Sequence, residues 1–158
     1  RTAMLMPLVL DGYVEADGEE QAETYARQCG LLRDSDDKPC YTVMVSTLLE
    51  ENGVNCTAPS FVASVDRLAS KYLRSAPFFA SGKVVSVLLG NPSDFEEYLH
   101  ILADEIPQMA DRVLNRRCRI GVSRMVGNLT ALHSAYREAM EALRQGDQAE
   151  FISAAQVK

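Results

Sequence analysis

The sequence predicts an α/β domain of the α+β kind, with a ferredoxin-like βαββαβ core, a mixed sheet, and one or two helices before the core. Three observations support this fold class. Tyr41–Leu49 is apolar and β-branched, as in a central strand. Two short apolar runs flank the turn residues 81–83, which predicts a hairpin. Within Arg117–Leu143, a short strand precedes an amphipathic helix.

Arg117–Leu143 is the most regular part of the chain. Cys118–Val122 predicts a strand in which Gly121 admits close approach of another backbone. Asn128 is a suitable N-cap for the helix that follows, because its side-chain oxygen can accept from the first unpaired N–H groups. The apolar residues of this helix recur at spacings of three and four and form one stripe, namely Leu129, Leu132, Tyr136, Ala139 and Leu143.

The N-terminal part predicts helices. Ala3–Asp11 carries apolar residues on one helical face and ends at Gly12, although Pro7 argues against an uninterrupted helix. Asp17–Leu31 has acidic residues in its first turn and Gly30 near its end, which favours a helix. The apolar face of Ala3–Asp11 needs a partner, so this segment is a candidate for pairing between subunits.

The middle of the chain alternates helix and strand. Ser60–Arg74 predicts an amphipathic helix, and Phe78–Ala80 and Val84–Leu89 predict the two strands of the hairpin. The next helix has two possible starts, Asn91 and a capping box of Ser93 with Glu96. It extends to about Leu114, and Pro107 is expected to kink or split it. The tail EFISAAQV is a candidate edge strand.

Composition indicates a single globular unit, with residues 1–38 as an N-terminal helical segment and residues 39–158 as the main domain. The net charge of −6 argues against direct binding of nucleic acid, which usually needs a basic face. The four cysteines lack CxxC spacing and there are two histidines, so a zinc site is not expected. Reduced thiols in a cytoplasmic protein are the favoured interpretation, with a secreted disulfide protein as the lesser alternative. The chain lacks an initiating Met, and we interpret it as a fragment of a longer protein.

Arg119–Arg124 (RIGVSR), a polar turn and then Leu132–Leu143 (LHSAYREAMEAL) resemble the degenerate GGDEF-like domains of bacterial transcription regulators. The resemblance is to the domain beside the helix-turn-helix region in AraC-type, YesN-like regulators, and the PucR- and CdaR-type regulator domain is the near alternative. The residues that match the family motif are Gly121, Ser123, Ser134, Tyr136, Arg137, Glu138 and Ala139.

This resemblance also provides a test of enzymatic activity. Diguanylate cyclases need an acidic hairpin and a metal-binding Asp on the first strand, because the metals align the triphosphate. Here Lys83 stands where the acidic pair would be expected, and Tyr41–Leu49 has no carboxylate; Glu50 and Glu51 come only after it. The chain is therefore expected to be no enzyme, with no catalytic, metal-binding or cofactor-binding residues and no cofactor.

Other candidate sites have simpler explanations. Ser81, Gly82 and Lys83 could contact a ligand, although a plain hairpin turn with a solvated lysine is the favoured interpretation. The acidic residues of the helix predicted to extend to about Leu114 fit a solvated face better than an acid/base pair, and these are Asp94, Glu96, Glu97, Asp104 and Glu105. His133 has no partner spaced to join it as a metal ligand.

The resemblance implies a non-catalytic, signal-transmitting domain between an upstream sensor and a C-terminal helix-turn-helix region that is absent here. It further implies a cytoplasmic homodimer formed through the parent protein, DNA contact only through the missing region, and no membrane contact by this fragment. The alternative function is a small-molecule sensor for a nucleotide- or sugar-like effector, with a pocket near the hairpin. By either reading, the effector is unknown.

Overall fold

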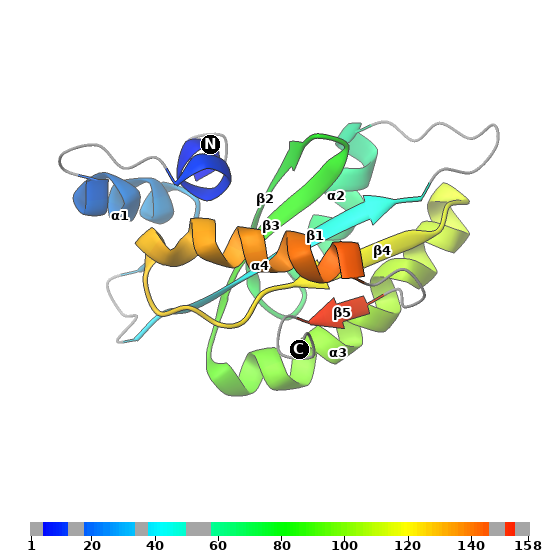
Figure 1. Ribbon diagram of the computed structural model, residues 1–158. Coiled ribbons are helices and arrows are strands. Elements are labelled where there is room, and N and C mark those ends of the chain that lie inside the picture. Colours follow the sequence, from blue (N-terminus) through cyan, green and yellow to red (C-terminus); the bar gives the residue numbers. More distant parts are fainter. Residues whose placement is uncertain (1–4, 13–17, 34–37, 50–57, 146–150, 154–158) are drawn as a thin grey trace.

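The computed structural model describes residues 5–12, 18–33, 38–49, 58–145 and 151–153 of the 158 residues. Its sheet has five strands in the order β2-β3-β1-β4-β5 (Figure 1). The strands are β1 (Cys40–Leu48), β2 (Arg74–Ala80), β3 (Lys83–Gly90), β4 (Cys118–Val122) and β5 (Phe151–Ser153). The first four pair antiparallel and β5 pairs parallel to β4, so the sheet is mixed. The predicted βαββαβ core is confirmed.

Helices cover both faces of this sheet (Figure 1). On one face lie α2 (Ala58–Ala69) and α3 (Pro92–Met109), which η3 (Ala110–Leu114) extends as a π-helical turn. On the other face lie α4 (Leu132–Gln145), with the 3₁₀ turn η4 (Leu129–Ala131) before it, and the N-terminal elements η2 (Pro7–Asp11) and α1 (Gly18–Gln28). The sheet therefore separates two hydrophobic cores.

Strand β1 is central and buried on both faces, as predicted. It pairs with β3 on one side and β4 on the other. Successive side chains of a strand point to opposite faces, so Val43 and Val45 belong to the core under α4, and Met44 belongs to the core under α2 and α3. This is why the segment is apolar without alternation.

The N-terminal segment packs against its own chain. Leu8 and Val9 are buried in the core under α4, together with Leu5. Gly12 ends η2 in the left-handed conformation with φ of +67°, and its N–H donates to the carbonyl of Leu8 at 3.1 Å. The stop at Gly12 is confirmed. The expectation that the apolar face of this segment is available for pairing between subunits is wrong, because that face is covered within the chain.

Two boundaries between α2 and β2 differ from the sequence prediction. Helix α2 ends at Ala69, five residues before the predicted end, and the Leu73 N–H bonds back to the Ala69 carbonyl at 3.0 Å within a turn. Strand β2 then begins at Arg74, four residues earlier than predicted. The sequence pattern concealed this start because Pro77 argues against a strand, but β2 is an edge strand, where a missing N–H is tolerated.

Helix α3 uses the first of its two possible starts. Asn91 precedes Pro92, and the Asn91 backbone N–H donates to Oδ2 of Asp94 at 3.0 Å. The predicted capping box of Ser93 with Glu96 is therefore wrong. Pro107 does not split the helix, which continues to Met109 and then widens into η3.

The C-terminal half agrees closely with the sequence pattern. The side-chain oxygen of Asn128 accepts from the Ala131 N–H at 3.0 Å, so the predicted cap is confirmed. The predicted edge strand in the tail corresponds to β5, at the end of the sheet. No helix among the described residues is both long enough and apolar enough to cross a bilayer.

Candidate functional site

The first candidate contact, the hairpin turn, lies at one end of the sheet. Ala80 pairs with Lys83, so the loop has two residues, Ser81 and Gly82, with φ of +50° and +79°. Positive φ at both central positions is the geometry of a type I′ turn, which joins twisted strands directly. Ser81 and Gly82 are exposed, and Lys83 Nζ donates to the Ser81 carbonyl at 3.3 Å. The local geometry is thus explained by hairpin formation, whereas ligand contact at these residues stays a prediction.

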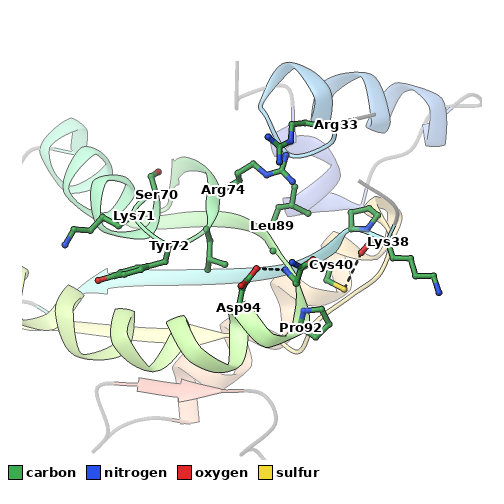
Figure 2. A pocket seen from close by; sticks show the side chains of 14 residues that line it. Arg33, Lys38, Cys40, Ser70, Lys71, Tyr72, Arg74, Leu89, Pro92 and Asp94 are labelled. Carbon is green, nitrogen blue, oxygen red and sulfur yellow. Dashed lines mark hydrogen bonds between the residues drawn. The ribbon is translucent and has the colours of Figure 1, made fainter. Parts of the chain in front are cut away.

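A cleft of about 950 Å³ lies at the opposite end of the sheet (Figure 2). It is formed by the residues just before β1, the turn between α2 and β2, the end of β3 and the start of α3. Lys83 begins β3, and Gly90, which lines the cleft, ends it; seven residues of strand separate the two by roughly 20 Å. The cleft is lined by Arg33, Lys38, Pro39, Cys40, Ser70, Lys71, Tyr72, Leu73, Arg74, Leu89, Gly90, Asn91, Pro92 and Asp94.

The described residues that line this cleft carry a charge opposite to the net charge of the chain. Four cationic side chains line it, those of Arg33, Lys38, Lys71 and Arg74, against the one carboxylate of Asp94 among the described lining residues. Asp94 accepts from the Asn91 N–H and thereby occupies the positive end of α3. Lys71 Nζ lies 3.3 Å from Glu105 Oε2, outside the lining residues. A carboxylate or phosphate is the ligand chemistry that such a lining favours.

A polar cluster fixes the turn between α2 and β2 onto α3, and so shapes one wall of the cleft. The Tyr72 hydroxyl donates to Glu105 Oε1, and the ring of Tyr72 stacks on Tyr98 with centroids 5.0 Å apart. This hydrogen bond is the main cause that lowers the pKa of Glu105, with Lys71 contributing to the same effect. The same bond raises the pKa of Tyr72, because it holds the proton on the phenol.

The family-motif residues lie elsewhere, where β4 meets α4. A Cβ atom built on Gly121 would lie 2.3 Å from the Ala139 carbonyl oxygen and 2.8 Å from the Leu143 nitrogen. The predicted close approach at Gly121 is therefore confirmed, and Ala139 is the small residue on the facing side. These two motif residues serve packing.

Ser123 and Glu138 fasten the end of β4. The Ser123 N–H donates to the Val43 carbonyl at 2.9 Å, and its Oγ accepts from the Val43 N–H at 3.0 Å. The same hydroxyl donates to the Arg124 carbonyl at 2.8 Å. Glu138 Oε1 accepts from the Arg124 N–H at 3.4 Å. Ser123 thus continues the pairing of β1 with β4 beyond the strand, and Glu138 attaches the residue after it to α4.

The remaining motif residues belong to α4. Ser134 and Arg137 are exposed, and Tyr136 is half-buried against the core, where desolvation and the Asp11 carboxylate raise its pKa. The structure therefore brings Gly121, Ser123, Glu138 and Ala139 together and leaves Ser134 and Arg137 at the surface. None of the seven lines the cleft described above.

Sequence reasoning missed the cleft and the contact made by His133. The cationic lining comes from segments far apart in sequence. The part of it that the sequence could have indicated is the pair of basic residues at the two ends of the charged loop, Arg33 and Lys38. His133 Nδ1 lies 3.0 Å from the Val9 carbonyl oxygen, a contact across 124 residues that no local pattern indicates. Within the described ranges, no three His, Cys, Asp or Glu side chains group as metal ligands.

Comparison with known proteins identifies a family and a similar fold. The sequence model of the family described as GGDEF-like domain matches residues 15–145. The active GGEEF domain of a diguanylate cyclase from Vibrio cholerae has a similar structure, with a TM-score of 0.50 and 15% sequence identity over 85% of this chain and 90% of that one. This likeness concerns the fold. No curated protein matches the chain significantly.

Proposed function

Because the chain belongs to the GGDEF-like domain family, we propose that it is a non-catalytic regulatory domain that transmits a signal within a cytoplasmic bacterial transcription regulator of the AraC type. One observation carries the proposal: the strands on which a cyclase would hold its metals have no acidic side chain. Residues 38–49 and 74–90, which are all described, contain neither Asp nor Glu.

Position and burial strengthen this observation. The side chains of Tyr41 to Ser46 on β1 are all buried, so the first strand offers packing groups and hydroxyls in place of ligands. At the hairpin, Lys83 supplies a positive charge where metal binding would need a negative one. Two divalent cations beside a triphosphate require carboxylate ligands, and a lysine would repel them.

The role in a regulator rests on the resemblance of residues 119–143 to AraC-type domains. In this proposal the parent protein is a homodimer, and a helix-turn-helix region outside this chain contacts DNA. The acidic balance of the chain agrees with that division of labour, since DNA binding depends on neutralising phosphates with Lys and Arg.

The test is a promoter–reporter assay with the regulator that contains this chain. Deleting the chain in frame is expected to change reporter output or abolish its response to signal, whereas Lys83→Ala is expected to leave both at the wild-type level. An output and response that survive the deletion would exclude a signal-transmitting role. Loss of response on Lys83→Ala would instead place function at the hairpin.

The cleft favours a second candidate function, that of a sensor for a small anionic molecule. A pocket near the hairpin was the sequence expectation for a sensor, but the cleft that the described residues form lies at the other end of the sheet. Residues 50–57, which follow β1 in the chain, lie outside the described residues, so a pocket near the hairpin stays a prediction. The cationic lining favours phosphorylated or carboxylated compounds over neutral sugars.

Thermal shift with inorganic phosphate, nucleotides and sugar phosphates tests this second candidate. A ligand that binds the native state and not the unfolded chain raises the melting temperature progressively as its concentration exceeds its Kd. Lys38→Glu in the cleft is expected to abolish the rise, and Lys83→Glu, the same change at the far end of β3, to preserve it. Equal loss in both variants would indicate non-specific charge screening and exclude the cleft as a binding site.

A further inference from the structure

Residues 5–12 lie across the first half of α4 and are fastened to it by His133. The Val9 carbonyl oxygen is 3.0 Å from His133 Nδ1. A carbonyl oxygen only accepts hydrogen bonds, so Nδ1 carries the hydrogen in this contact. The imidazole therefore reaches from the helix to the backbone of a segment more than a hundred residues earlier.

The same imidazole ring also packs on the end of this segment. A Cβ atom built on Gly12 would lie 3.0 Å from His133 Cδ2 and 3.1 Å from Cγ, which is closer than Cβ atoms usually approach, so the ring would have to shift to admit a side chain here. Gly12 also adopts φ of +67°, which disfavours other residues. Tyr136 lies one turn after His133 on α4. The Asp11 carboxylate is close enough to it to contribute to the raised pKa of the Tyr136 phenol.

Helix α4 joins the two ends of the described chain. Its first half carries the N-terminal segment, and its second half packs on β4 at Gly121 and contacts β5 (Figure 1). The buried residues of the segment, Leu5, Leu8 and Val9, belong to the core under α4 and not to the core under α2 and α3. A displacement of the segment would thus alter one face of the sheet and leave the other in place.

We propose that residues 5–12 are a detachable strap, that His133 is its latch, and that release of the strap loosens the first turns of α4. The strap is the place where a signal from the N-terminal side enters this domain, and α4 carries it toward β5. Its signalling role rests on the proposed function, but the latch is a property of this chain and is tested on the chain alone.

Amide hydrogen exchange of the 158-residue chain, read by mass spectrometry, tests the latch. The Gly12 N–H, which bonds to the Leu8 carbonyl, reports the state of the strap. His133→Ala is expected to speed exchange in residues 5–12 roughly tenfold, since one hydrogen bond and the ring contact are lost. Exchange in residues 132–136 rises with it, and exchange in α3 stays at the wild-type rate.

His100→Ala is the matched control, because His100 is exposed on α3 at the other face of the sheet. It is expected to leave exchange in residues 5–12 unchanged. If His133→Ala has no effect on the strap, or speeds exchange equally in α3, His133 is not a latch. A rise confined to the strap and the start of α4 supports the proposal and holds whether or not the reporter assay supports the regulatory role.

A double substitution separates the latch from general destabilisation. Gly12→Ala forces a methyl group toward the His133 ring and strains the backbone. Removing the ring relieves the first effect and not the second, so Gly12→Ala should speed strap exchange less in the His133→Ala background than in the wild type. Additive effects of the two substitutions would contradict the packing of His133 on the strap.

Discussion

At Gly121 the backbones of β4 and α4 lie in close contact. A Cβ there would lie 2.3 Å from the Ala139 carbonyl oxygen, which is backbone and cannot turn aside. The sequence predicted this approach from a single glycine within an apolar strand, because glycine in a strand otherwise weakens it. The motif around Gly121 thus reflects how α4 is seated on the sheet.

Gly121→Ala is expected to lower the free energy of unfolding by about 2 kcal/mol, because α4 must shift away from β4 to admit the methyl group. Urea unfolding followed by circular dichroism measures this change. Gly127→Ala is the control, since Gly127 is exposed and no atom lies within 4 Å of its added Cβ. Equal stability of the two variants would show that the close approach is not needed.

At the same scale, His133 shows what a sequence cannot indicate. The sequence around His133 indicates no metal-ligand partner and no other contact, because its contact with Val9 depends on where the N-terminal segment folds. Ser123 is similar: its motif position was apparent from the resemblance, but its bonds to the backbone of Val43 and Arg124 follow from strand register. Sequence patterns report periodicity and local chemistry, and long-range pairing decides the rest.

At the scale of elements, the joint between α2 and α3 depends on the protonation of Glu105. The pKa of this carboxyl is lowered in the folded protein, mainly by the Tyr72 hydroxyl. A lowered folded-state pKa means that the stabilisation is present above the unfolded-state pKa and is lost as the pH falls through the folded-state value. The Tyr72–Glu105 bond should therefore contribute at neutral pH and weaken in acid.

Tyr72→Phe is expected to destabilise the protein at neutral pH. Its stability should approach that of the wild type once the pH falls below the folded-state pKa of Glu105, because the carboxyl is then protonated in both the folded and the unfolded protein. Chemical unfolding at a series of pH values measures the difference. Tyr98→Phe is the control, because it keeps the aromatic stack and removes a hydroxyl that does not bond to Glu105 in the structure. Its effect on the free energy of unfolding should therefore not vary with pH. If the difference in free energy of unfolding between Tyr72→Phe and the wild type stays constant over the whole acid series, the bond does not depend on the ionisation of Glu105.

The element boundaries show where sequence patterns are reliable. The central strand, the hairpin, the stripe of α4 and its Asn128 cap were predictable because each has a strong local period or turn signal. The end of α2 and the start of β2 were not, because an edge strand tolerates Pro77 and the helical spacing continues into the turn. For α3, two adjacent caps were possible, and packing selected Asn91.

At the scale of the whole molecule, the domain has a GGDEF-like fold, but residues 38–49 and 74–90 carry no carboxylates. The βαββαβ order of elements and the mixed sheet are those expected from the sequence, whereas the strand order and the helices on both faces are known only from the structure. The cationic cleft could not be predicted, because its lining joins the loop before β1 to the α2–β2 turn and the start of α3. The charge of its described lining residues is also opposite to the net charge of the chain.

Because residues 38–49 and 74–90 have no carboxylates, we expect the protein to lack diguanylate cyclase activity. The purified chain, incubated with GTP and either Mg²⁺ or Mn²⁺, should form no cyclic dinucleotide, as measured by liquid chromatography and mass spectrometry against an active diguanylate cyclase. GTP recovered intact is the predicted result. Metal-dependent formation of the cyclic product would contradict the non-catalytic role.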